Sequence, residues 1–101
     1  MKLIEMNMDK IIALCHRFRV KSLSVFGSIL TDRFSEQSDV DFLVNFDTTD
    51  HEQWDYVSNY FGFRDALEAL FNRKIDLIEE QGIRNPLFLA AINKHKMPIY
   101  G

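Results

Sequence analysis

The 101-residue sequence has little of several features that mark particular classes of protein. Cys15 is its one cysteine, which excludes an internal disulfide and a cysteine-based zinc site, and which fits a reducing compartment. The longest uninterrupted apolar run, from Leu87 to Ile92, is too short to span a bilayer. Glu5 also interrupts the start of the chain, where a signal peptide would need its apolar segment. Together these absences predict a cytoplasmic protein.

Positive charge is missing from the middle of the chain. No Lys or Arg lies between Arg33 and Arg64, whereas this stretch carries seven acids, and the formal net charge is −3. Such a stretch would repel a nucleic-acid backbone, and the bases elsewhere form no run, so we do not expect nucleic acid as the primary partner. The acidic stretch is either a solvated loop or a surface that attracts metal ions or a basic partner.

Length and composition predict one globular domain over residues 1–101. Hydrophobic residues make up 47% of the chain and charged residues 27%, and nine Phe provide bulky material for a core. Alternating helical and strand-like patterns predict an α/β fold. Asn7 and Asn85 precede two of the helical stretches as candidate caps. The patterns predict helices over 8–18, 57–71 and 87–94, a short helix from Gly27, and strands over 22–26, 39–46, 75–78 and 99–100.

Two acids stand close together at the start of the second predicted strand. Side chains alternate between the faces of a strand, so Asp39 and Asp41 are expected on one face and Val40 on the other. At a separation of about 4 Å and an effective dielectric constant near 20, two such charges repel each other by about 4 kcal/mol. A divalent cation offsets this repulsion, and carboxylates suit Mg²⁺ or Mn²⁺. A solvated pair of unrelated acids is the alternative.

A Gly-Ser pair ends the preceding strand. Gly27 lacks a Cβ, so the backbone can turn there and approach a phosphate closely, and Ser28 adds a hydroxyl. In isolation, an ordinary turn with Ser28 as the cap of a short helix is the favoured explanation for the pair. The aromatic residues Trp54, Tyr56 and Tyr60 could stack on a base, although residues at the start of an apolar helix more often join the core.

These motifs together resemble a known family. Gly27-Ser28, ten intervening residues and then Asp39-Val40-Asp41 are similar to the signature of the nucleotidyltransferases related to DNA polymerase β, and specifically of their minimal, single-domain prokaryotic branch. The resemblance implies a small mixed sheet of three to four strands flanked by about four helices. It also implies a third catalytic acid, for which Asp76 in the last long strand is the match. An ion pair with Arg73 or Lys74 is the other explanation for that acid.

The resemblance implies a particular chemistry. Asp39, Asp41 and Asp76 would hold two Mg²⁺ or Mn²⁺ ions, and Gly27, Ser28 and Ser38 would bind the phosphates of ATP. Asp76 is the candidate general base for a hydroxyl that attacks the α-phosphorus. The product would be AMP linked to that hydroxyl.

The resemblance also implies a partner. Small members of the family are commonly encoded beside an all-helical HEPN toxin, and act as antitoxins that transfer AMP to a tyrosine of the toxin. One departure from the family pattern stands just after the Gly-Ser pair, where Leu30-Thr31-Asp32 replaces a small residue, Arg and Gly. This departure favours an alternative, a module that binds its toxin or a nucleotide and neutralises by occlusion. Transfer to a small molecule is disfavoured, because the enzymes that do so carry a further helical domain.

Overall fold

A mixed four-stranded sheet forms the centre of the molecule. The computed structural model describes residues 2–49 and 55–101. The strands are β1 (Val20–Phe26), β2 (Val40–Phe46), β3 (Ile75–Glu79) and β4 (Met97–Tyr100), in the spatial order β3-β2-β1-β4. The inner pair β1–β2 is antiparallel, as is the edge pair β1–β4, whereas β2 and β3 run parallel.

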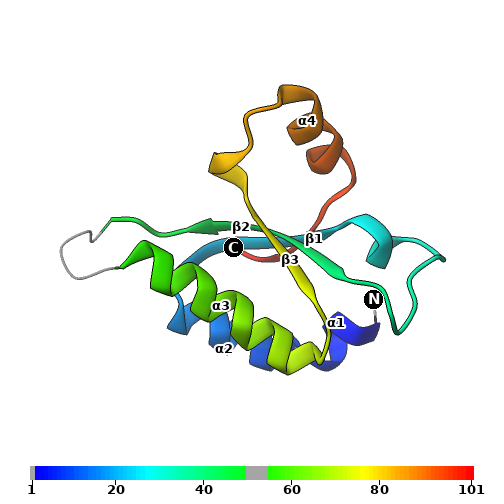
Figure 1. Ribbon diagram of the computed structural model, residues 1–101, viewed down its shortest axis with the longest axis horizontal. Coiled ribbons are helices and arrows are strands. Elements are labelled where there is room, and N and C mark those ends of the chain that lie inside the picture. The colour runs from blue at the N-terminus through cyan, green and yellow to red at the C-terminus, as the bar shows by residue number, and fades with distance from the viewer. Residues whose placement is uncertain (1, 50–54) are drawn as a thin grey trace.

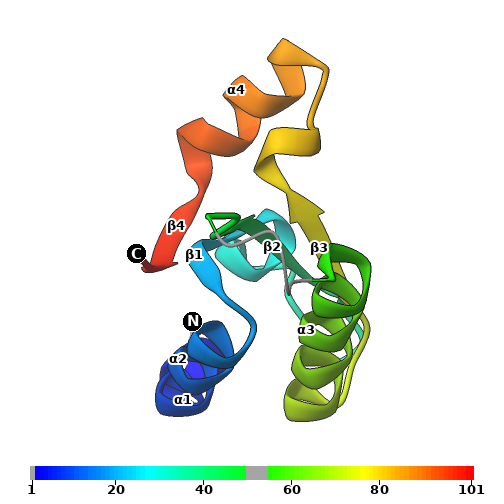
Figure 2. The ribbon, with the colours of Figure 1, turned by 90° about the vertical axis from the view of Figure 1, so that its left-hand side faces the viewer.

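Helices lie on both sides of this sheet. Figures 1 and 2 show α1 (Lys2–Met6), α2 (Met8–Arg17) and α3 (Tyr56–Phe71) on one side and α4 (Pro86–His95) on the other. Two short 3₁₀ helices, η1 (Gly27–Leu30) and η2 (Glu80–Gly82), follow β1 and β3. The predicted fold class, an α+β domain with a small mixed sheet and about four helices, is therefore confirmed.

The alternation of side chains along β2 decides which face of the sheet is the core. Val40, Phe42 and Val44 are fully buried on the face that α2 and α3 cover. The Phe42 ring lies 6.0 Å from that of Phe71 at the end of α3. The intervening residues of β2, which include Asp41, therefore project toward the α4 side.

The two large helices on the core side pack closely at Gly62. A Cβ built on Gly62 would lie 2.7 Å from the ring of Phe18, which follows α2. A glycine costs an exposed helix interior about 1 kcal/mol, and here it lets the ring approach the backbone of α3. The apolar periodicity over 57–71 predicted this helix to within one residue.

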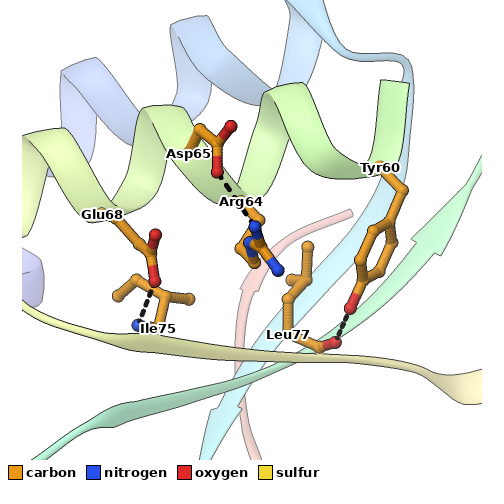
Figure 3. A network of polar contacts seen from close by, with 6 residues as sticks. All are labelled: Tyr60, Arg64, Asp65, Glu68, Ile75 and Leu77. Carbon is orange, nitrogen blue, oxygen red and sulfur yellow. Dashed lines mark hydrogen bonds and ion pairs between the residues drawn. The ribbon is translucent and has the colours of Figure 1, made fainter. Parts of the chain in front are cut away.

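Side chains of α3 form hydrogen bonds with backbone groups of the edge strand β3. Figure 3 shows the Tyr60 hydroxyl donating to the carbonyl of Leu77, while the Glu68 carboxylate accepts from the Ile75 amide at 3.2 Å. Occupied edge groups hinder pairing with another strand. Tyr56 stacks on Tyr60 and its hydroxyl donates to Glu79, so both tyrosines have structural contacts, whereas Trp54 lies outside the described residues.

The prediction of helix caps was wrong for Asn7, near the start of the chain, and is confirmed for Asn85, near its end. The sequence did not predict α1, and Asn7 does not cap α2 with its side chain, which donates to the Leu3 carbonyl instead. Asn85 does cap α4, because its Oδ1 accepts from the Leu87 and Phe88 amides at 2.9 and 3.4 Å. None of the described helices has the length and apolar character needed to cross a membrane.

Candidate functional site

Three chain segments meet at one end of the sheet. Phe26, the last residue of β1, pairs with Asp41 of β2, and Asp41 pairs in turn with Asp76 of β3. Gly27 and Ser28 follow Phe26 directly, as the first residues of η1. Residues separated by up to 50 positions in the sequence therefore lie side by side, and both acids are on the face that α4 overhangs.

Gly27 lies against the carboxylate of Asp41. Its φ of +77° is in the left-handed region that favours glycine, and a Cβ at this position would lie 2.2 Å from Oδ2 of Asp41. Two independent constraints, backbone conformation and space, thus require glycine here. The consequence is a backbone turn packed directly onto an acid.

The carboxyl group of Asp41 is held in an unfavourable environment for a negative charge. Burial, followed by the charges of Asp76 and Asp39 and a hydrogen bond with the Asp76 side chain, raises the pKa of Asp41 from 3.8 to about 6. Asp76 itself is exposed, as is Asp39. The cluster therefore carries unbalanced negative charge on the α4 side of the sheet, which a cation would stabilise.

Asp39 is placed differently from the expectation. It precedes β2, which starts at Val40, so the prediction that both acids of the pair lie on one strand was wrong. Pairing with β3 begins only where the Val40 amide donates to the carbonyl of Lys74 at 3.3 Å. Asp39 is still near enough for its charge to act on Asp41. Within residues 2–49 and 55–101, no group of three His, Cys, Asp or Glu side chains is arranged to hold a metal ion.

The two candidate serines have different surroundings. Ser28 does not cap η1 with its side chain; its carbonyl accepts from the Thr31 amide at 2.9 Å and from the Thr31 hydroxyl at 2.8 Å. The Ser38 hydroxyl accepts from the Ser35 amide at 3.0 Å and lies 3.2 Å from the Ser35 hydroxyl. Ser38 therefore closes the turn that leads into Asp39, in addition to any role toward a phosphate.

Comparison with known families identifies the family of this chain. The family described as "Nucleotidyltransferase domain" matches residues 9–99, which is 91 of the 101 residues and includes every candidate site residue. The chain belongs to this family. It is a nucleotidyltransferase of the minimal kind, and the resemblance found in its motifs is confirmed.

Relatives of this nucleotidyltransferase are named for transfer to proteins. The protein adenylyltransferase MntA of Thermococcus cleftensis is 32% identical over 78 residues, which are 77% of this chain and 74% of the relative. A candidate protein adenylyltransferase of Methanocaldococcus jannaschii, MJ0128, is 35% identical over 78 residues, with the same two shares.

Solved structures agree with the fold. A structure described as a candidate minimal nucleotidyltransferase superimposes with a TM-score of 0.76 at 25% identity, covering 96% of this chain and 93% of that one. A toxin-antitoxin structure with AMP-PNP has a TM-score of 0.71 at 18% identity, covering 94% of this chain and 73% of that chain. The latter likeness concerns the fold alone.

Two apolar hollows of this nucleotidyltransferase border α4. One, of about 520 Å³, includes Gly27 in its wall. The other, of about 660 Å³, lies between α3, β3 and the start of α4. The side chain of Phe88 contributes to both, so α4 divides the open face into two compartments. Of the candidate site residues, Gly27 lines one of these hollows, whereas Asp39, Asp41 and Asp76 line neither.

One site residue has contacts that the sequence did not predict. Arg73 was considered only as an ion-pair partner for Asp76, but among the described residues neither Arg73 nor Lys74 forms an ion pair with that acid. Arg73 instead donates to two carbonyl groups of the loop before Asp39. No periodicity signals such a contact, because its partners are backbone atoms 35 and 38 positions away.

Proposed function

We propose that this nucleotidyltransferase moves AMP from ATP onto a hydroxyl of a protein partner, as the antitoxin of a HEPN toxin. The observation that carries the proposal is the contact of Asp41 with both Asp76 and Gly27 at one end of the sheet. The acids that would bind a metal ion therefore lie next to the backbone turn that would bind a phosphate. Two relatives named as protein adenylyltransferases support the choice of AMP and of a protein acceptor.

The acids fit Mg²⁺ or Mn²⁺. Asp41 and Asp76 are in contact and lack a compensating ion pair among the described residues, and Asp39 is near enough to join them. Mg²⁺ is commonly held by one or two carboxylates together with substrate phosphates, so the absence of a preformed three-ligand cage is compatible with such a site. Two bound ions would stabilise the pyrophosphate that leaves and favour deprotonation of the attacking hydroxyl.

The chain's own residues then have separate tasks. Gly27 and Ser28 bind the phosphate tail of ATP, since the glycine backbone leaves room for close approach, and Ser38, directly before Asp39, adds a hydroxyl for the same phosphates. Asp76, which is exposed on β3, accepts the proton of the acceptor hydroxyl. The acceptor oxygen bonds to the α-phosphorus, the bond from that phosphorus to the bridging oxygen breaks, and pyrophosphate leaves in line.

The acceptor comes from a second protein. The acids lie on the α4 side of the sheet, and the hollow that includes Gly27 in its wall leaves space for an incoming chain. A HEPN toxin is the proposed partner because structural relatives were solved as toxin-antitoxin complexes, including one with a tri-AMPylated HEPN toxin. Since ATP is the donor, we place the reaction in the cytoplasm.

Neutralisation by occlusion without transfer is the second candidate. Thr31 stands where the resembled family has Arg, and its hydroxyl closes the η1 turn by donating to the Ser28 carbonyl at 2.8 Å. The chain therefore lacks a cation directly after the Gly-Ser pair, and the phosphates would be held without an arginine at this position. This reading keeps the complex with the toxin and predicts no change in the toxin's mass.

Intact-mass spectrometry of the partner separates the two candidates. The protein is co-expressed with the product of its neighbouring gene, as wild type and as the Asp39→Asn, Asp41→Asn double variant. A double variant with two acids of the opposite side removed, Glu5→Gln with Asp9→Asn, serves as the matched control. Partner mass that rises by one or more AMP units with wild type and control, and not with the site variant, supports transfer. An unmodified partner in a stable complex with all three forms supports occlusion.

A further inference from the structure

We infer that Arg73 is a positioning residue that fixes Asp39 in the site. The inference rests on the proposed function, since it assigns to Asp39 a role in holding metal and nucleotide. Arg73 lies in the short connection between α3 and β3, after the left-handed residue Asn72 and two residues before the strand. Arg73 is thus held between two regular elements by a connection of three residues, whereas Asp39 ends a longer loop.

The side chain of Arg73 reaches across to the loop between η1 and β2. Its Nη1 donates to the carbonyl of Ser38 at 2.9 Å and to that of Ser35 at 3.0 Å. The guanidinium group also lies over the ring of Phe34, 4.8 Å from its centroid. One side chain therefore contacts three residues of a single loop. Hydrogen bonds from a charged donor are stronger than those from a neutral donor. The ring of Phe34 adds the attraction between a cation and the face of an aromatic ring.

Asp39 is held from both sides by consecutive residues of one segment. Ser38, before it, accepts from the Arg73 side chain, and Val40, after it, donates to the Lys74 carbonyl at 3.3 Å. Two residues beyond Lys74 is Asp76, which contacts Asp41. The segment 73–76 thus connects the loop acid to the two strand acids, and it can set their spacing.

The loop has little else to define its position. Thr31 to Arg33 and Ser35 to Gln37 are exposed. Apart from the bonds of Thr31 to Ser28 at its start, the side-chain hydrogen bonds of residues 31–37 other than those from Arg73 join residues within the loop, among the residues that the structure describes. Phe34 is its half-buried residue that packs against the core. Loss of the Arg73 contacts would widen the range of positions open to Asp39, while Asp41 and Asp76 would keep their places in paired strands.

The expected phenotype is weaker metal binding with nearly intact chemistry. Residues that hold a ligand in place typically contribute about ten- to a hundredfold to metal affinity. We expect Arg73→Ala to raise the Mn²⁺ concentration for half-maximal nucleotide binding by about tenfold. The transfer rate at saturating Mn²⁺ should remain within about twofold of wild type, because saturation restores the ligand geometry.

The experiment compares wild type, Arg73→Ala, Arg73→Lys and a control, Arg17→Ala. Arg17 also lies over a phenylalanine ring, that of Phe18 at 5.1 Å, but belongs to α2 on the opposite side of the sheet. Two readouts are taken well below each melting temperature: hydrogen exchange of residues 31–39, and the Mn²⁺ midpoint for binding a non-hydrolysable ATP analogue. Lysine keeps the charge but loses the planar group over the ring, so it should give intermediate values.

The outcomes distinguish this inference from the proposed function. Faster exchange over 31–39 together with a raised Mn²⁺ midpoint in Arg73→Ala, and neither in Arg17→Ala, supports it. A folded Arg73→Ala protein with the wild-type midpoint overturns it, even if the variant is less stable, because a purely structural role lowers stability alone. If Arg73→Ala does not fold, Arg73→Lys and Phe34→Leu are judged by the same midpoint. Absence of metal-dependent nucleotide binding in wild type would instead refute the proposed function.

Discussion

Replacing Asp41 with asparagine should stabilise the protein in the absence of metal. The substitution keeps the shape of the side chain, removes its charge, and lets an amide donate to the neighbouring Asp76. The pKa of Asp41 is about 6 in the folded protein and 3.8 in the unfolded chain. At high pH this difference lowers the free energy of unfolding by at most about 3 kcal/mol. Asp41 is only partly buried, so solvent screening reduces our expectation to about 1 kcal/mol.

The effect should depend on pH with a definite sign. Because the folded protein binds the Asp41 proton more tightly than the unfolded chain, wild-type stability falls as the pH rises from about 3.8 to about 6. Asp41→Asn lacks this loss. The variant should therefore be more stable than wild type at pH 8, with a melting temperature about 4 °C higher, and nearly equal to it at pH 4.

Urea denaturation at pH 4 and pH 8, followed by circular dichroism, measures the difference directly. Asp9→Asn, an exposed acid on the far side of the sheet, is the matched control and should differ little from wild type at either pH. Added Mg²⁺ should stabilise wild type more than Asp41→Asn. A variant that is less stable than wild type at pH 8, or a gain of equal size at both pH values, would refute the reasoning.

Two further substitutions and one labelling experiment test other parts of the structure. Gly27→Ala should destabilise by about 1–2 kcal/mol in urea and abolish transfer, because its Cβ would meet Asp41, whereas Gly82→Ala, with open space around it, should do neither. Asn85→Ala should cost about 1 kcal/mol through loss of the α4 cap; an unchanged denaturation midpoint would contradict that role. Cys15, whose pKa burial raises to about 12, should resist thiol reagents at pH 8 until guanidinium is added, and rapid labelling of the native protein would show that this helix is not packed as described.

The sequence by itself determined the order and kind of most elements. Apolar positions at helical spacing located α2 and α3, because a helix that must bury one face repeats its apolar residues every three to four positions. The Gly-Ser pair and the Asp-Val-Asp motif singled out the candidate site, and the structure brings Gly27 and Asp41 together. Asn85-Pro86 located the start of α4 through capping chemistry that is local to those residues.

Only the tertiary structure decided how the acids are arranged. Strand alternation placed Asp39 beside Asp41, but β2 begins one residue later, because the first pairing bond to β3 comes from the Val40 amide. The acceptor of that bond is the carbonyl of Lys74, which is 34 positions away, so no local sequence pattern can predict it. The short helix α1 was missed for a related reason, since five residues are too few for periodicity to be read.

Arg73 shows the same limit from the other direction. Its neighbours in sequence suggested an ion pair with Asp76, whereas the side chain donates to loop carbonyl groups and lies over Phe34. Every residue has a backbone carbonyl group, so the residue type of the partner does not show that a distant side chain donates to it. Motif and periodicity thus specify which chemistry the chain carries, while the packing of distant segments sets where each group is held.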